Sequence, residues 1–244
     1  MGYQRSSDRP SSDAALNLIG AVSAAASDLA GVYVVMHGST EDEFCLIHPG
    51  TKVRKCHTSR RDAFQTVNEN PAGRVSKGGE IEIFRQEKSK HGNENLELKD
   101  GFEEKVALLK IHPSIKSRVI DNLIEDDYKG IVLEGTGLGH APESLQEGIK
   151  KATEEDIPVA MTSQCLWGRT NMRVYSTGRD LLNMGVFSLE DMLPETAYVK
   201  MMWVLDKTQD PEEVKSLMKK NLAGEISDRT RADTYPRQNL PEDG

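Results

Sequence analysis

Lys55 is the residue whose surroundings in this sequence most clearly suggest proton-transfer chemistry. It lies in a basic segment, residues 51–64. If this segment is extended, alternate side chains share a face, so Lys55 shares the inward face with Val53 and His57 while Lys52 takes the outer face. A buried lysine near other cations loses its proton more readily and is a candidate proton acceptor. The alternative is a solvated charge, the usual state of a lysine in a basic run.

Polar residues also follow three apolar runs in the second half of the chain. They form the segments 112–114, 135–140 and 162–165. In an open parallel sheet, ligands bind beyond the carboxyl ends of the strands. The segment 135–140 imitates a dinucleotide-binding fingerprint, but His140 replaces its last glycine. We therefore expect a glycine-rich turn that lifts His140 into a cleft, with a solvated histidine as the alternative.

Two other groups of residues have both a structural and a chemical interpretation. Cys165 is a candidate nucleophile with His140 as its base, but a buried structural cysteine is the expectation. The hydroxyl- and carboxylate-rich segment 6–13 either caps the following helix or lines a polar substrate site. The six histidines show neither His-Glu-x-x-His nor His-x-His spacing, so no metal site is expected.

Composition excludes several classes of protein. The formal net charge of −8 argues against a general binder of nucleic acid or acidic membranes. Three widely spaced cysteines give no disulfide framework, and a reducing cytoplasm is the simplest location. No apolar run approaches the roughly 20 residues of a membrane span, so no membrane partner is expected.

The apolar pattern predicts an α/β protein with parallel and mixed sheets flanked by helices. In the first part we expect a helix at 12–30, a strand at 32–36 typical of a parallel sheet, a strand at 44–47, and an edge hairpin that leads into a linker over 76–101. From residue 103 onward, strands alternate with helices, which indicates parallel pairing. The expected strands are 106–111, 130–134 and 157–162, and the expected helices are 115–125, 143–153, 189–206 and 211–222.

Several longer motifs make the chain recognisable. The segments 4–14 and 55–64 resemble the asparaginase/glutaminase family. Within it, the segments 135–140, 162–172 and 174–182 look like the group of D subunits of archaeal-type glutamyl-tRNA(Gln) amidotransferases. The resemblance covers nearly the whole chain.

This resemblance implies a two-domain asparaginase-like fold whose N-terminal domain is incomplete in this chain. The expected domain limits are residues 1–85 for the end of the N-terminal domain, 86–102 for a linker, 103–224 for the C-terminal domain and 225–244 for a polar tail. The implied activity is hydrolysis of glutamine in a homodimer. The ammonia would pass to the E subunit of the amidotransferase, which would use ATP and Mg to amidate glutamate on tRNA. No cofactor is expected in the glutaminase part itself.

The family's catalytic residues are two threonines, an aspartate and a lysine. Lys55 matches the lysine, which would help the aspartate to deprotonate a threonine. By the same resemblance, His140 and Tyr175 would line the substrate pocket of a neighbouring subunit.

The chain departs from the family in one respect. The Thr-Gly-Gly-Thr and His-Gly-Thr-Asp-Thr motifs that carry the threonines and the aspartate do not occur, and the segment 37–42 echoes the second only superficially. We therefore expect an N-terminally truncated subunit, whether a fragment or half of a split gene, that is inactive alone. The alternatives are a non-catalytic assembly module and a fragment of a free-standing L-asparaginase.

Overall fold

The computed structural model describes residues 2–84 and 97–236, and it divides the chain into two compact units. Unit 1 comprises Met1–Glu97 and Arg231–Gly244, and unit 2 comprises Leu98–Thr230. Most of the predicted linker, residues 86–102, lies outside the described residues, as does the end of the predicted tail. Glu225, the first residue of the predicted polar tail, is buried.

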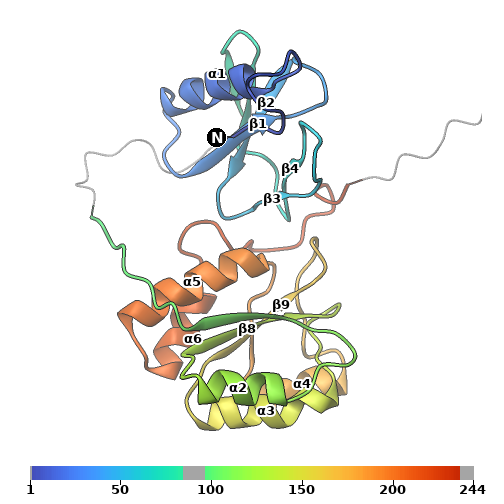
Figure 1. Ribbon diagram of the computed structural model, residues 1–244, viewed down its shortest axis with the longest axis vertical. Coiled ribbons are helices and arrows are strands. Elements are labelled where there is room, and N and C mark those ends of the chain that lie inside the picture. The colour runs from blue at the N-terminus through green and yellow to red at the C-terminus, as the bar shows by residue number, and fades with distance from the viewer. Residues whose placement is uncertain (1, 85–96, 237–244) are drawn as a thin grey trace, which may run out of the picture. The chain divides into compact units, whose positions relative to one another are not determined.

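Unit 1 is a helix packed on a four-stranded antiparallel sheet, with a separate two-stranded hairpin (Figure 1). The sheet has the order β1-β2-β5-β6, and the hairpin pairs β3 with β4. Leu16 and Ala24 of the helix pack against Val35, Cys45 and Ile47 of the sheet. The elements are α1 (Ala14–Ala25), β1 (Tyr33–His37), β2 (Phe44–Pro49), β3 (Val53–Lys55), β4 (Phe64–Thr66), β5 (Gly73–Ser76) and β6 (Ile81–Ile83).

The first strand corrects a prediction. The apolar run 32–36 was expected to be parallel to its neighbour, but β1 pairs with β2 in antiparallel register, with His37 opposite Cys45. Only residues 38–43 connect the two strands, and a parallel pair needs a crossover of roughly a dozen residues or more. The apolar run therefore reflects the cover that α1 gives to one face of the sheet, not the burial of a parallel strand.

Unit 2 has the predicted parallel sheet, with strand order β10-β9-β8-β7 and helices on both faces (Figure 1). One core lies between the sheet and α2, α3 and α4, and the other lies between the sheet and α5 and α6. The elements are β7 (Val106–Lys110), α2 (Arg118–Glu125), β8 (Gly130–Gly135), α3 (Glu143–Glu154), β9 (Val159–Ser163), α4 (Ser176–Asn183), β10 (Phe187–Ser188), α5 (Pro194–Lys207) and α6 (Pro211–Lys219).

Three elements of unit 2 differ from the sequence prediction. The helix α4 and the strand β10 were not predicted, and α5 begins at Pro194 rather than at Leu189. Proline is favoured in the first turn of a helix, where its missing N–H is not needed, so Pro194 sets the start of α5. The predicted α/β architecture, with parallel and antiparallel sheets flanked by helices, is confirmed.

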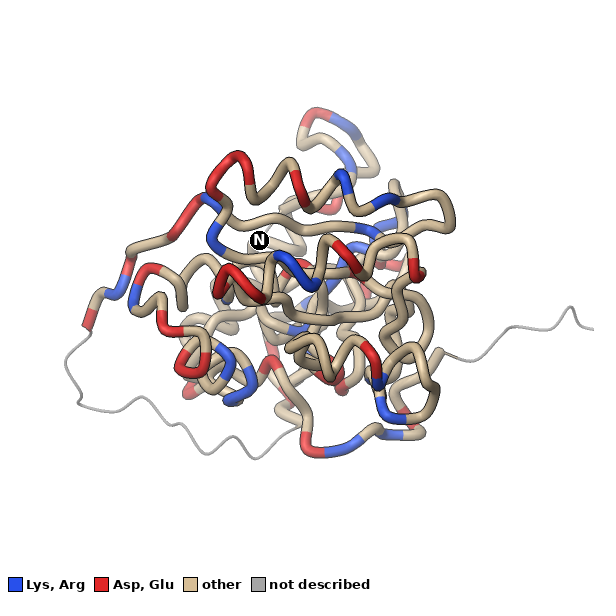
Figure 2. Tube along the Cα trace, turned by 90° about the horizontal axis from the view of Figure 1, so that it is seen from below, with Lys and Arg blue, Asp and Glu red and all other residues tan. Residues whose placement is uncertain are grey.

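Charged residues of both signs are interspersed along the described chain (Figure 2). Across residues 2–84 and 97–236, no helix is both long and apolar enough to cross a membrane. Within the same residues, no three His, Cys, Asp or Glu side chains are grouped so that they could hold a metal ion.

Candidate functional site

Lys55 ends strand β3, where it pairs with Phe64 of β4. Its side chain is exposed, which agrees with the alternative of a solvated charge and not with burial. The buried lysine is Lys52, which has no exposed surface. Lys52 lies in the turn before β3, and the strand begins only at Val53. The alternation assumed over the whole segment therefore does not apply to Lys52, and its burial has to be read from the fold.

The loop after Lys55, residues 56–63, is tied together by its own polar groups. The Nδ1 atom of His57 accepts hydrogen bonds from the backbone N–H groups of Ser59 and Arg60, both at 3.1 Å. Arg60 pairs with Asp62 at 2.7 Å, and this guanidinium lowers the pKa of the Asp62 carboxyl. The backbone N–H of Cys56 bonds to the carbonyl of Ala63, which closes the loop. The loop thus holds a defined shape next to Lys55.

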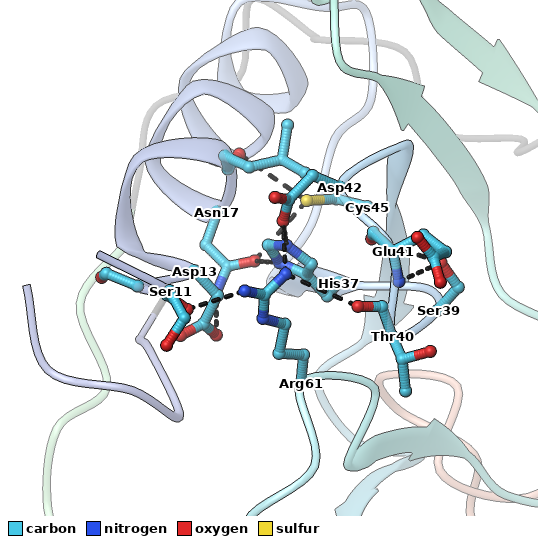
Figure 3. A network of polar contacts seen from close by, with 12 residues as sticks. Ser11, Asp13, Asn17, His37, Ser39, Thr40, Glu41, Asp42, Cys45 and Arg61 are labelled. Carbon is cyan, nitrogen blue, oxygen red and sulfur yellow. Dashed lines mark hydrogen bonds and ion pairs between the residues drawn. The ribbon is translucent and has the colours of Figure 1, made fainter. Parts of the chain in front are cut away.

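Arg61 connects this loop to two other segments (Figure 3). Its Nη1 atom lies 2.6 Å from Asp42 Oδ1, in the turn between β1 and β2. Its Nη2 atom donates to the carbonyl oxygen of Ser11 at 2.7 Å. The Arg61 side chain is only 12% exposed, so these contacts are partly shielded from solvent. Asp42 was part of the segment that merely echoed the family's catalytic motif.

His37 continues this network into the interior. Its Nδ1 atom lies 2.7 Å from Asn17 Oδ1 and its Nε2 atom 3.1 Å from Asp42 Oδ1. Asn17 Nδ2 donates to Gly2 O and to Asp13 Oδ2, which places the amide oxygen toward His37. The hydrogen bond from His37 lowers the pKa of Asp42, with a further contribution from the charge of Arg61. Asp42 is therefore a carboxylate at neutral pH.

Asp13 anchors the start of the described chain. Its carboxylate accepts hydrogen bonds from the backbone N–H groups of Gln4 and Arg5 at 2.9–3.0 Å. Burial pushes the pKa of Asp13 upward, but these hydrogen bonds hold it below its usual value. Asp13 makes no side-chain cap to α1, so the capping interpretation of this residue is wrong. It instead fixes the segment 4–13 in front of the helix.

In unit 2, the structure brings the other two predicted site residues together. The rings of His140 and Tyr175 meet edge to face with centroids 5.3 Å apart. His140 Nδ1 lies 3.2 Å from the hydroxyl of Thr177, whereas its Nε2 atom is buried without a hydrogen-bond partner in the described structure. Gly137 and Gly139 have positive φ values of 51° and 98°, which glycine adopts readily, so the tight turn before His140 is confirmed.

Cys165 is exposed, so its expected burial is wrong. It follows strand β9 in a turn where its backbone N–H bonds to Ser163 Oγ. Among the described residues, no hydrogen bond joins Cys165 to His140, whose ring contacts Thr177 and Tyr175 instead. The proposed pairing of a cysteine nucleophile with a histidine base therefore has no geometric support.

A cavity of about 530 Å³ lies in unit 2 between the segment 169–173, the region around β10 and helix α6. Four basic residues line it together with Glu190: Arg169, Arg173, Lys215 and Lys219. Neither His140 nor Tyr175 lines this cavity. The two site residues predicted for unit 2 therefore lie outside it.

The network around Arg61 was not predicted from the sequence. Its residues are far apart in the chain, because Asp42 lies 19 positions and Ser11 lies 50 positions before Arg61. The only signal in the sequence is that Asp42, in a short connection between two strands, follows His37 at the end of the first strand by five positions. Lys55 and Arg61 lie in unit 1, and His140 and Tyr175 in unit 2.

Two family models match the chain. Residues 1–89 match the model described as asparaginase, N-terminal, and residues 105–218 match the glutaminase/asparaginase C-terminal domain. Among solved structures, the chain resembles the thermostable L-asparaginase of Thermococcus kodakarensis, with 32% identity and a TM-score of 0.81 over 93% of this chain and 67% of that one. L-asparaginase I of Vibrio cholerae gives 28% identity and a TM-score of 0.77 over 93% and 66%.

Curated relatives are more similar in sequence. The D subunit of the glutamyl-tRNA(Gln) amidotransferase of Pyrococcus abyssi is 58% identical over 97% of this chain and 54% of the relative. The protein of the same name from Methanothermobacter thermautotrophicus is 53% identical over 94% of this chain and 52% of the relative. The chain thus spans about half the length of the curated relatives that it matches.

Proposed function

The chain belongs to the glutaminase/asparaginase family, and we propose that it is part of the glutaminase subunit of a glutamyl-tRNA(Gln) amidotransferase. One observation favours the amidotransferase subunit over a free-standing asparaginase of the same family. Identity is 58% to an amidotransferase D subunit but 32% to a solved L-asparaginase, over similar shares of this chain. The proposed reaction hydrolyses the side-chain amide of glutamine and releases glutamate and ammonia.

The proposed complex divides the chemistry between two kinds of subunit. A homodimer of the glutaminase supplies ammonia, and the E subunit uses ATP and Mg to activate glutamate on tRNA(Gln) and to amidate it. The glutaminase would therefore meet the tRNA only through the complex, and no cofactor acts at its own site. We place this work in the cytoplasm, where aminoacyl-tRNA is used.

Lys55 is the catalytic residue that we propose for this chain. Lys55 is the exposed last residue of strand β3, directly before a well-defined loop. In the family's mechanism it would assist an aspartate that deprotonates a nucleophilic threonine. The two motifs that contain these groups do not occur among the 244 residues. We therefore propose that hydrolysis needs residues supplied from outside this sequence.

His140 and Tyr175 are proposed to shape the substrate pocket of a neighbouring protomer. Their edge-to-face contact gives the imidazole a fixed orientation, and Thr177 engages only Nδ1. The Nε2 atom of His140 retains the capacity for one hydrogen bond. A group on the substrate or on the neighbouring protomer could use this capacity, which supports a contact role rather than a catalytic one.

Ammonia release from glutamine tests the proposal. The 244-residue chain alone is expected to show no turnover above background. Measurable turnover would contradict the proposal that hydrolysis depends on the two threonine motifs that this sequence does not contain. A polypeptide that contains these residues together with both threonine motifs is expected to hydrolyse glutamine. In it, Lys55→Met should lower kcat about a thousandfold or more. Lys77→Met, which removes another exposed lysine of unit 1, is the matched control.

Two alternatives have distinct outcomes. A free-standing asparaginase would prefer asparagine to glutamine in the same assay, and the two substrates differ by one methylene. A non-catalytic assembly module would dimerise or bind the E subunit without any turnover, whether or not both motifs are present. In the described part of unit 1, β1 forms an edge of its sheet, which leaves a strand edge that another segment can pair with.

A further inference from the structure

We propose that Arg61 is a positioning residue that fixes the loop next to Lys55, residues 56–63, against two other segments of unit 1. These are the segment 2–13 and the turn between β1 and β2, residues 38–43. Only the catalytic consequence of this placement rests on the proposed function. The connection between the three segments stands on the contacts of Arg61 itself.

The guanidinium group of Arg61 uses different nitrogens for different segments. Nη1 contacts Asp42 Oδ1 at 2.6 Å, and the carbonyl of Thr40 lies 3.5 Å from the same nitrogen. Nη2 donates to Ser11 O at 2.7 Å (Figure 3). A planar guanidinium presents its donors in a fixed fork, so two segments bound to it are held in a set relation. The ammonium of a lysine has no such fork.

The partners of Arg61 are themselves held in place. Asp42 contacts His37, His37 contacts Asn17, and Asn17 bonds to Asp13 and to Gly2 O. His37, Asn17 and Asp13 have no exposed surface. The contact made by Arg61 is therefore continued through a buried chain of hydrogen bonds into strand β1 and helix α1.

Both ring nitrogens of His37 take part in this chain. Its Nδ1 atom faces the amide oxygen of Asn17 and its Nε2 atom faces a carboxylate oxygen of Asp42, and both are acceptors. Asp42 therefore contacts both the buried His37 and Arg61. The turn 38–43 is thereby bound from the interior and from the loop.

The hairpin that carries Lys55 needs such support. Strands β3 and β4 form a two-stranded sheet with three residue pairs. A two-stranded hairpin by itself is marginally stable at best in water. The internal bonds of His57 and Arg60 set the shape of the loop, but they do not tie it to the rest of unit 1. The contacts of Arg61 do so from within the same loop.

Amide hydrogen exchange of this chain, followed by mass spectrometry, tests the physical part of the proposal. In Arg61→Ala, peptides that cover residues 56–63 and 38–43 should exchange about tenfold faster or more, while the core of β2 stays protected. Arg61→Lys should show an intermediate increase. Arg74→Ala, which breaks an exposed ion pair with Glu82, is the control and should leave both segments unchanged. Unchanged exchange in both Arg61 variants would overturn the proposal.

A second variant covers the case in which Arg61→Ala does not fold. Asp42→Asn keeps the shape of the side chain and removes the charge that Arg61 and His37 share. It should accelerate exchange in residues 56–63 although the substitution lies in another segment. No effect on that loop would show that the contact does not transmit position.

The catalytic part is tested in the polypeptide that also contains both threonine motifs. Arg61→Ala should lower kcat about tenfold or more with a smaller change in KM, and Arg61→Lys should restore part of the rate. Faster loop exchange with unchanged kcat would overturn the positioning role. If Lys55→Met left kcat unchanged while Arg61→Ala still loosened the loop, the proposed role of Lys55 would fail and the anchoring by Arg61 would stand.

Discussion

Each unit contains a cluster of charged side chains around a lysine or an arginine, and these two clusters differ in burial. In unit 2, Lys200 of α5 contacts Glu225 at 2.5 Å, and the two side chains are 7% and 2% exposed. In unit 1, Arg61 contacts Asp42, whose side chain is 53% exposed. Both clusters join segments that are distant in sequence, yet only the first is closed to solvent.

The pair in unit 2 is also saturated with hydrogen bonds. Lys200 Nζ donates to the carbonyls of Met218 and Lys220 at the end of α6, and Glu225 accepts from the N–H groups of Leu222 and Ala223. Burial lowers the pKa of Lys200 against the opposing effect of Glu225. Burial alone would raise the pKa of Glu225, but Lys200 and the backbone bonds hold it low.

The two ion pairs, Lys200–Glu225 and Arg61–Asp42, differ in burial and therefore in what they do in the structure. A desolvated, fully bonded pair has one arrangement, and breaking it leaves a buried charge without a partner. A half-exposed pair can exchange with water, so it holds loops together at low energetic cost. The pair Lys200–Glu225 fixes the chain after α6, whereas the pair Arg61–Asp42 holds the loop that follows Lys55.

The largest effect is expected from Lys200→Met. It leaves the buried carboxylate of Glu225 unpaired and should lower the free energy of unfolding of unit 2 by about 3–5 kcal/mol. Urea denaturation followed by tryptophan fluorescence measures this directly, because Trp167 and Trp203 both lie in unit 2. Lys215→Met, which breaks an exposed pair with Glu212, should change the value by less than about 1 kcal/mol. Equal effects of the two substitutions would contradict the role of burial.

The second effect concerns His48, which is buried in unit 1. Burial lowers its pKa to about 4, and within the described residues only Nδ1 has a partner, Thr66 Oγ1 at 2.8 Å. Between its usual pKa of 6.5 and about 4, the unfolded chain binds a proton that the folded state excludes, so stability falls as the pH falls. The expected loss is about 3 kcal/mol.

Hydrogen exchange in unit 1 at several pH values, corrected for the intrinsic rate, measures this loss. His48→Gln cannot take up the proton and should flatten the pH dependence. The exposed His57→Gln variant should keep it. A flat profile in the unchanged chain would mean that His48 accepts its proton without cost.

A smaller effect is expected from Asp42→Asn. Because the Asp42 side chain is half exposed, its ion pair with Arg61 should contribute less than about 1 kcal/mol to the stability of unit 1 at neutral pH. The pKa of Asp42 is lowered, so this contribution is present above its usual value of 3.8 and is lost as the pH falls below that value. Hydrogen exchange at about pH 7 and about pH 3 should show the difference from the unchanged chain only at the higher pH.

The smallest effect concerns the access of a thiol reagent to the three cysteines. Cys45 is fully buried under α1, and burial raises the pKa of its thiol to about 12, whereas Cys56 and Cys165 are exposed. A thiol reagent at about pH 8 should modify two of the three cysteines, as mass spectrometry would show. If the contacts of Arg61 also limit the opening of helix α1, then Arg61→Ala should speed the slow labelling of Cys45. Rapid labelling of Cys45 in the unchanged chain would contradict its burial.

Local pattern accounts for the part of the fold that was predicted. Apolar runs of strand length that alternate with amphipathic segments indicated the β7, β8 and β9 strands and their parallel pairing. The same reasoning failed for β1, whose short connection to β2 should have outweighed its apolar character. It also missed α4, which carries Gly178 in its interior, a residue that weakens helices.

Gly178 shows why that helix was not evident. A Cβ atom at this position would collide with the backbone carbonyl of Met172, so glycine is required by the close approach of another segment. The requirement arises from packing between α4 and the preceding chain. No periodicity within residues 176–183 reports it.

The sequence by itself determined the family and the residue types available for chemistry, because these depend on the motifs around Lys55, His140 and Tyr175. The tertiary structure alone decided that Lys52 is buried and Lys55 exposed, because the boundary of β3 sets which side chains alternate. It alone joined Ser11, Asp42 and Arg61, which are separated by up to 50 positions. Spacing along a chain fixes the faces of one element, whereas contacts between elements follow from how those elements pack.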